Sequence, residues 1–148
     1  MVNINNVLCE VISSFYNSFV EKNITPKIDL PKETVRVIGN EGAIKRVLSN
    51  LTINVINHSK EDICISLKKE NNKVIVTTIN RCENINNDEV DLLFNRFYKK
   101  EDIARTNNNG SAGLGLSIAK SLMEKMNGKI YSKYEDNLLY ISCEWKLK

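Results

Sequence analysis

Residues 41–59, EGAIKRVLSNLTINVINHS, carry an apolar stripe and a polar stripe, both at helical spacing. The apolar stripe predicts a helix with one face buried in a core. Gly39 and Asn40 precede it, and asparagine is a favoured helix cap. The segment therefore predicts one long amphipathic helix, whose core-facing residues are Ile44, Val47, Leu48, Leu51 and Val55.

The polar stripe consists of Asn50, Asn54, Asn57 and His58, which spacings of three and four residues place near one helical face. Asparagine is a mediocre helix former, so an aligned set indicates either a solvated face or a polar task. An amide oxygen is a suitable ligand for Mg²⁺, which otherwise keeps its waters and substrate phosphates. The helix therefore has a candidate ligand-binding side, with plain solvation as the alternative.

Periodicity on both sides of this helix predicts an α/β domain. Asn3 or Asn5 can cap a helix over residues 4–21, and a short helix is expected around 88–97. A further helix over 113–126 ends at Asn127-Gly128. Apolar and β-branched runs predict strands at 22–30, 33–38, 62–68, 73–79, 129–135 and 138–147. The pattern predicts a two-layer α/β sandwich, in which three main helices cover one face of a mixed, mostly antiparallel sheet.

Composition and charge argue against several classes of protein. With 148 residues, 42% apolar and 26% charged, we expect one globular domain over residues 1–148. A net charge of +3 without clustered Lys/Arg disfavours nucleic-acid binding. No apolar run approaches the roughly 20 residues that span a bilayer, and the N-terminus lacks signal-peptide features. His58 is the single histidine and the four cysteines lie far apart, so we expect neither structural zinc nor disulfides.

A glycine-rich stretch, residues 110–120 (GSAGLGLSIAK), opens the predicted helix at 113–126. A helix N-terminus offers unpaired N–H groups, and glycines let a phosphate approach the backbone. The spacing fits neither a P-loop nor a dinucleotide fingerprint. On its own the stretch indicates either phosphate binding or a flexible linker. Residues 98–112 lack periodicity and predict a lid-like loop.

Residues 93–99, LFNRFYK, bring aromatic and basic side chains to the edge of that loop. Two aromatic residues three apart on a helix usually pack in a core. Arg96 and Lys99 are within reach of a phosphate bound at the glycine-rich stretch, or are simply solvated.

Residues 80–85, NRCENI, end the strand at 73–79 without a glycine. Taken in order, these stretches resemble the ATP-binding catalytic domain of bacterial sensor histidine kinases, within the GHKL superfamily. KRVLSNLTINVINHS resembles the N box, NRCENI stands at the G1 box, LFNRFYK resembles the F box and GSAGLGLSIAK the G2 box. The resemblance covers nearly the whole chain and implies the Bergerat fold, with ATP and Mg²⁺ as ligands.

The resemblance implies roles for the N box and G1 box residues. Asn54 matches the Mg²⁺-coordinating asparagine, and Asn50 lies one turn earlier on the side that faces ATP. His58 matches a position near the nucleotide. Asn80 stands where a side chain accepts from the adenine N6 amine.

The resemblance also implies a lid. Arg96 and Lys99 match basic positions near the phosphates, and Phe94 and Phe97 match residues that anchor the lid. Gly110 corresponds to a lid hinge.

In the G2 box, Gly113 and Gly115 match glycines that bring backbone N–H groups to the phosphates. The implied nucleotide-binding set is completed by Asn57, Ile85, Tyr98, Leu114 and Leu116.

Two departures from the family pattern affect the nucleotide contacts. Asn57 replaces a basic residue common in the N box, which removes one phosphate contact. Asn80, Cys82 and Asn84 stand where Asp, Gly and Gly are usual. The Asn80 amide still accepts from N6 and can donate toward N1, while Asn84 tolerates positive φ. We expect a working but weaker adenine site, because a charge-assisted hydrogen bond becomes a neutral one.

Asn50 bears on the type of reaction. Gyrase, mismatch-repair ATPases, the heat-shock chaperone and anti-sigma serine kinases carry a glutamate at this position, which acts as general base. The amide of Asn50 cannot take a proton, so ATP hydrolysis as the primary activity is disfavoured. A histidine kinase needs positioning and charge stabilisation here, because the acceptor imidazole is itself the nucleophile.

The resemblance therefore implies a protein histidine kinase domain without a catalytic base. Its implied partners are a separate helical dimerisation and phosphoacceptor domain and a response regulator, with no nucleic acid and no direct membrane contact. The implied location is cytoplasmic, within a parent protein anchored in the cell membrane. The alternative is a degenerate domain that keeps the fold and serves protein contacts without nucleotide.

Overall fold

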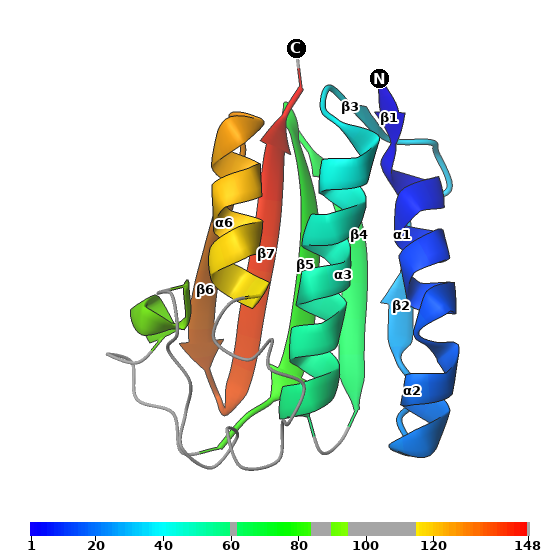
Figure 1. Ribbon diagram of the computed structural model, residues 1–148, viewed down its shortest axis with the longest axis vertical. Helices are drawn as coiled ribbons and strands as arrows, with labels where there is room; N and C mark the ends of the chain where they lie inside the picture. Colours follow the sequence, from blue (N-terminus) through cyan, green and yellow to red (C-terminus); the bar gives the residue numbers. More distant parts are fainter. Residues whose placement is uncertain (60–61, 84–89, 95–114, 148) are drawn as a thin grey trace.

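The computed structural model describes residues 1–59, 62–83, 90–94 and 115–147. These residues form two layers, with the α-helices side by side on one face of a sheet (Figure 1). The predicted two-layer α/β sandwich is confirmed.

The main sheet has five strands in the order β2-β4-β5-β7-β6. Its antiparallel part runs through β4 (Ile63–Glu70), β5 (Lys73–Arg81), β7 (Leu138–Lys146) and β6 (Lys129–Glu135). A short edge strand, β2 (Lys27–Asp29), pairs parallel to β4. The sheet is therefore mixed and mostly antiparallel, as the sequence predicts, with β5 at its centre.

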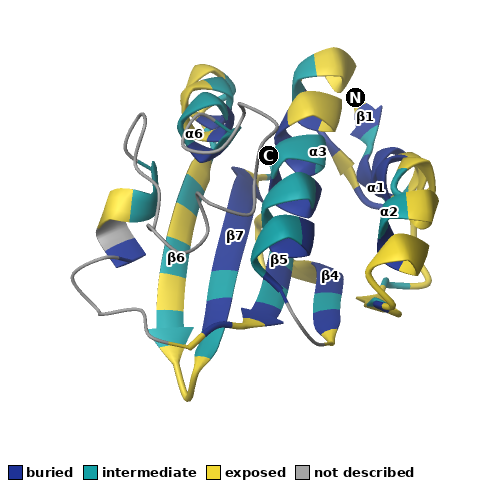
Figure 2. Ribbon diagram, turned by 60° about the horizontal axis from the view of Figure 1, so that its bottom comes forward, coloured by how far each residue is buried: buried dark blue, intermediate teal, exposed yellow. Residues whose placement is uncertain are grey.

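Side chains of β5 alternate between the two faces of the sheet, as they must in an extended strand. Val74, Val76, Thr78 and Asn80 are buried, whereas the residues between them are half-buried (Figure 2). The buried set faces the helices, so Asn80 continues the core-facing row of β5 at the end of the strand.

The long predicted helix is present as α3 (Glu41–His58). Asn40 caps it, because its Oδ1 accepts a 2.9 Å hydrogen bond from the Ala43 N–H. The whole predicted apolar stripe is buried, together with Thr52 and Ile56. Thr52 satisfies its hydroxyl by donating to the Leu48 carbonyl at 2.8 Å.

The helix α6 (Gly115–Lys125) packs beside α3 over β6 and β7 (Figure 1). It ends where predicted, with Asn127 in the left-handed region at φ 60°. The next residue, Gly128, is confined by its surroundings. A Cβ there would lie 2.7 Å from Met123 Cε and 2.8 Å from the Glu144 carbonyl oxygen, so the chain can return to β6 only through glycine.

The prediction of one helix over residues 4–21 is wrong in its continuity. The structure has α1 (Ile4–Ser14) and α2 (Tyr16–Glu21), separated at Phe15, where ψ is 10°. Ser14 explains the break, because its hydroxyl donates to the Val11 carbonyl at 2.6 Å and competes with the helix backbone. Of the two candidate caps, Asn3 is used, and its Oδ1 accepts from the Asn6 N–H at 3.1 Å.

The predicted strands at 22–30 and 33–38 are shorter than expected. Residues 22–26 lie outside any strand, and the chain turns there, because Asn23 has φ 56° and the Ile24 N–H donates back to the Phe19 carbonyl. The strand β3 covers only Arg36–Val37 and pairs with an unpredicted strand, β1 (Val2–Asn3), in a separate two-stranded sheet. Such short strands depend on tertiary pairing and leave no periodic pattern in a sequence.

Within the described residues, no helix has both the length and the hydropathy needed to cross a bilayer. All four cysteines lie in described segments, and none of them forms a disulfide there.

Candidate functional site

The polar stripe of α3 faces the start of α6. Gly115, the first residue of α6, lies against Asn50, and a Cβ built on the glycine would be 3.9 Å from Asn50 Cβ. Figure 1 shows the two helices running in opposite directions, with the start of α6 beside α3. The fold thus brings the polar residues of the N box next to a helix N-terminus, where unpaired backbone N–H groups and the helix dipole favour an anion.

Asn50 and Asn54 have unusual hydrogen-bonding states. The Nδ2 atom of each is buried and makes no hydrogen bond within the described residues. An unmet buried donor of this kind destabilises a protein by about 1–3 kcal/mol. Two such donors, one helical turn apart, indicate a face built to meet a ligand that accepts hydrogen bonds.

The end of β5 supplies a third amide. Asn80 is buried to 1% exposure and lies in the sheet between Ile63 of β4 and Leu139 of β7. Its Nδ2 donates to the Arg81 carbonyl at 3.3 Å, which is a long contact. Two residues earlier, on the same face of β5, the Thr78 hydroxyl is buried without a partner in the described part of the chain. The sequence analysis missed Thr78, because threonine in a strand is indistinguishable from an ordinary β-former.

The segment that follows Asn80 is fixed by the C-terminal hairpin. The Cys82 N–H donates to the Asn137 carbonyl at 2.9 Å, and the Tyr134 hydroxyl donates to the Cys82 carbonyl at 2.6 Å. Asn137 occupies the hairpin turn with φ 62°. These contacts hold the start of the G1 segment in a defined position although it lacks the usual glycines.

His58 lies at the end of α3 and is largely withdrawn from water. Burial, and then the nearby positive charge of Lys22, lower the pKa of His58 to about 4. Lys22 is held there because its Nζ donates to the Ile56 carbonyl at 2.7 Å. His58 is therefore a neutral imidazole at pH 7. Asn57, the other N box residue that the sequence singles out, is half-buried on the same helix.

Two further predicted residues lie in described segments. Phe94 ends a short 3₁₀ helix, η1 (Asp91–Phe94), and packs half-buried against the core. Ser132 of β6 stabilises this segment by donating to the Val90 carbonyl at 3.0 Å. Leu116 is buried in the core at the start of α6. Eight predicted site residues lie outside the described residues: Ile85, Arg96, Phe97, Tyr98, Lys99, Gly110, Gly113 and Leu114.

The donor set of the site fits a hard cation bound together with phosphates. The described residues contain no cluster of three His, Cys, Asp or Glu side chains. The side-chain oxygen donors of the α3 face are amides, and an amide oxygen is a hard ligand that suits Mg²⁺ when waters and phosphates complete its shell. Asn50 and Asn54 each carry such an amide oxygen, one helical turn apart on α3.

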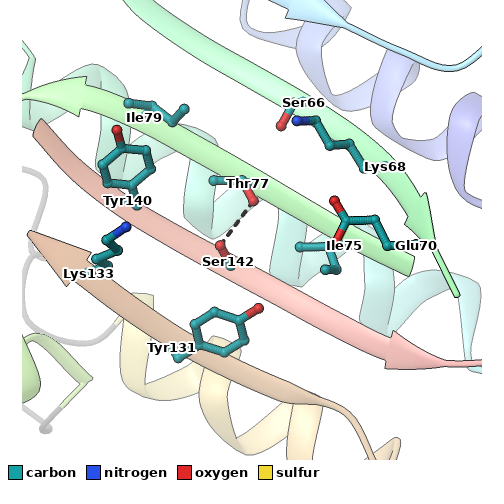
Figure 3. Close-up of a pocket in the computed structure, with 10 residues that line it drawn as sticks. All are labelled: Ser66, Lys68, Glu70, Ile75, Thr77, Ile79, Tyr131, Lys133, Tyr140 and Ser142. Carbon is teal, nitrogen blue, oxygen red and sulfur yellow. Dashed lines mark hydrogen bonds between the residues drawn. The ribbon is translucent and has the colours of Figure 1, made fainter. Parts of the chain in front are cut away.

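A separate hollow lies on the opposite face of the sheet. It is lined by outward-facing residues of four strands, among them Lys68, Thr77, Lys133 and Ser142 (Figure 3). Thr77 and Ser142 satisfy each other through a hydrogen bond of 3.0 Å. None of the predicted site residues in the described segments lines this hollow; Asn80 lies on the other face of β5.

Comparisons with known proteins agree with this geometry. A family model described as histidine kinase-, DNA gyrase B- and HSP90-like ATPase matches residues 39–139. The sensor protein DltS of Streptococcus agalactiae serotype III is 34% identical over 142 residues, covering 94% of this chain and 35% of DltS. The sensor histidine kinase YcbM of Bacillus subtilis is 31% identical over 131 residues, covering 87% of this chain and 42% of YcbM. The chain thus spans well under half the length of these two relatives.

Solved structures with the same fold include the nucleotide-free catalytic domain of histidine kinase ThkA. Its TM-score is 0.83 at 26% identity, covering 98% of this chain and 94% of that domain. The structure of ThkA in complex with the response regulator protein TrrA has a TM-score of 0.82 at 25% identity, covering 99% of this chain and 41% of ThkA. The chain therefore belongs to the family of histidine kinase-, DNA gyrase B- and HSP90-like ATPases, as a catalytic ATP-binding domain of the sensor histidine kinase type.

Proposed function

We propose that this domain binds ATP with Mg²⁺ between α3 and the start of α6, and presents the γ-phosphate to a histidine on a separate dimerisation and phosphoacceptor domain. The observation that carries the proposal is the pair of buried, unpartnered Nδ2 atoms of Asn50 and Asn54 beside Gly115. Bound nucleotide would give these donors acceptors. When bound, Mg²⁺ would neutralise charge on the transferring phosphoryl group.

The proposed roles of individual residues are those that the family resemblance implies. Asn54 holds Mg²⁺ through its amide oxygen, and Asn50 donates to a phosphate oxygen. The backbone at Gly115 faces the phosphates, and Asn80 contacts the base. His58 lies near the nucleotide as a neutral imidazole. Arg96 and Lys99, together with the other predicted residues outside the described segments, complete the phosphate contacts and the lid.

Position 50 supplies no general base in this proposal, because the amide of Asn50 cannot accept a proton. That is compatible with transfer to an imidazole, which attacks phosphorus as a neutral nucleophile while ADP leaves. His58 is not the acceptor, because it is withdrawn from water on the same helix that holds the metal ligand. The phosphorylated histidine would then pass its phosphoryl group to a response regulator, in a parent protein anchored in the membrane.

A degenerate domain that binds no nucleotide is the second candidate. It is favoured by the amide of Asn80 in place of a carboxylate and by Asn57 in place of a basic residue. The two candidates differ in one measurable property, which is Mg²⁺-dependent ATP binding.

Calorimetric titration of Asn54→Ala tests the proposed metal ligand. We expect ATP binding by this variant to lose its dependence on Mg²⁺, whereas Asn17→Ala, at an exposed site on α2, retains it. An unchanged Mg²⁺ dependence in Asn54→Ala would contradict the assigned role. Incubation with γ-labelled ATP should leave His58 unlabelled. Efficient labelling of His58 would overturn the proposal that the phosphoacceptor histidine lies on a separate domain.

A further inference from the structure

The side chain of Asn80 lies between apolar neighbours in the sheet, and these neighbours do not fix the orientation of its amide group. Its neighbours across the sheet, Ile63 and Leu139, are 2% and 1% exposed and offer no polar side-chain atom. Its one side-chain hydrogen bond within the described residues is the 3.3 Å contact to the Arg81 carbonyl. A contact of that length constrains the amide weakly. One N–H and the carbonyl oxygen therefore make no hydrogen bond with the described residues, and a half-turn of the amide exchanges their places.

The edge of a purine base distinguishes an amide from a carboxylate. Adenine offers a donor at N6 and an acceptor at N1, whereas hypoxanthine and guanine offer an acceptor at O6 and a donor at N1. A carboxylate only accepts hydrogen bonds, so it pairs with the N6 amine of adenine. Opposite the O6 of a 6-oxopurine it makes no hydrogen bond, because neither oxygen carries a proton. An amide complements the adenine edge in one orientation and the 6-oxopurine edge in the other.

Thr78 adds an independent observation on the same strand face. Its hydroxyl is buried without a partner among the described residues, two positions before Asn80. Residues at this spacing in a strand have Cα atoms about 7 Å apart and side chains on the same face, so the Thr78 hydroxyl and the Asn80 amide are neighbours on that face. A hydroxyl rotates to donate or to accept, so Thr78 can adapt to either base edge, as the amide can.

We propose that Asn80, supported by Thr78, makes the base subsite permissive, so that 6-oxopurine nucleoside triphosphates bind alongside ATP. This inference rests on the proposed function, because it concerns the base of the nucleotide that the site binds. The substitution of amide for carboxylate then changes which bases are accepted and does more than weaken one contact.

Inosine triphosphate is the appropriate probe, since it carries the 6-oxopurine edge without the extra amine of guanine. Calorimetric titrations compare ATP and inosine triphosphate, each with Mg²⁺, on the wild-type domain and on the isosteric variant Asn80→Asp. In the wild type we expect the two dissociation constants to agree within about tenfold. In Asn80→Asp we expect the preference for ATP to rise by about tenfold or more, because a donor to O6 has been replaced by an acceptor.

The result for the wild type decides the inference even if Asn80→Asp does not fold. Wild-type protein that binds ATP but binds inosine triphosphate more than about a hundredfold more weakly overturns the inference and leaves the proposed function standing. An ATP preference that is the same in wild type and in folded Asn80→Asp also overturns it. Folded wild-type protein that binds neither nucleotide overturns the proposed function and this inference together.

Discussion

Gly115 faces Asn50, so that a Cβ built on the glycine would lie 3.9 Å from the Cβ of the asparagine. This separation is an ordinary van der Waals contact, and α3 therefore does not require glycine at position 115 for steric reasons. In the proposed nucleotide site, the glycine at position 115 has a different role. Because it has no side chain, it lets a phosphate reach the first N–H groups of α6.

Gly115→Ala separates packing from ligand binding. We expect the free energy of unfolding to stay unchanged or rise by up to about 1 kcal/mol, because alanine favours a helix over glycine. We expect ATP affinity to fall about fivefold or more, since a methyl group enters the space of the phosphates. Chemical denaturation and calorimetric titration check the two quantities, with Ser121→Ala on an exposed turn of α6 as the control. Unchanged ATP affinity would show that the phosphates do not approach this residue.

The unmet amides of α3 predict a conflict between stability and function. Asn54→Leu removes a buried donor that has no partner among the described residues, so the unliganded domain should gain about 1 kcal/mol in unfolding free energy. The same variant should lose Mg²⁺-dependent ATP binding. Asn17→Leu, at an exposed position, should change stability by less than about 0.5 kcal/mol and leave binding intact. Loss of stability in Asn54→Leu with retained ATP binding would indicate a structural asparagine.

His58 predicts a pH dependence of stability. Its pKa is about 4 in the folded state and about 6.5 when unfolded, so the unfolded chain binds more protons between these values. The His58 contribution is therefore fully present above about pH 6.5 and is lost as the pH falls toward 4. The loss amounts to at most about 3 kcal/mol.

Denaturation curves of wild type and His58→Gln across this pH range test that contribution. The difference in unfolding free energy between the two proteins should shrink or reverse in sign as the pH falls from neutral to 4, because only the wild type takes up the extra proton on unfolding. A difference that is constant with pH would mean that His58 titrates normally in the folded state.

Tyr134 predicts a link between the C-terminal hairpin and the base subsite. Tyr134→Phe removes the 2.6 Å hydrogen bond to the Cys82 carbonyl and should lower the unfolding free energy by about 1 kcal/mol. ATP affinity should fall as well, since Cys82 closely follows Asn80. Tyr140→Phe provides a matched control on the opposite face of the sheet. Equal effects of the two substitutions would remove the special role of Tyr134.

The sequence predicts the fold well where its periodicity is long. The stripe from Ile44 to Val55 specifies α3, and Asn40 marks its start, because both signals are local. The break at Phe15 follows from a side-chain hydrogen bond of Ser14, which competes with the helix backbone and leaves the apolar stripe intact. The pairing of β1 with β3 was not predictable, because two-residue strands are stabilised by their partners alone.

The candidate site, like the fold, is only partly predictable from the sequence. Motif matching assigns Asn50, Asn54 and Asn80 from their positions in the chain. Their hydrogen-bonding states come only from the packing of α3, α6 and β5, which leaves donors of the two N box asparagines unmet. Strand alternation carries the Thr78 hydroxyl to the face of Asn80, and no sequence motif marks it.

In the proposed function, the polar face of α3 beside α6 is a working nucleotide site that uses Mg²⁺. Calorimetric titration of the wild-type domain with ATP, in the presence and absence of Mg²⁺, is the decisive experiment. We expect saturable one-to-one binding that is markedly weaker without Mg²⁺. A folded domain that binds no ATP up to millimolar concentrations in the presence of Mg²⁺ would contradict it.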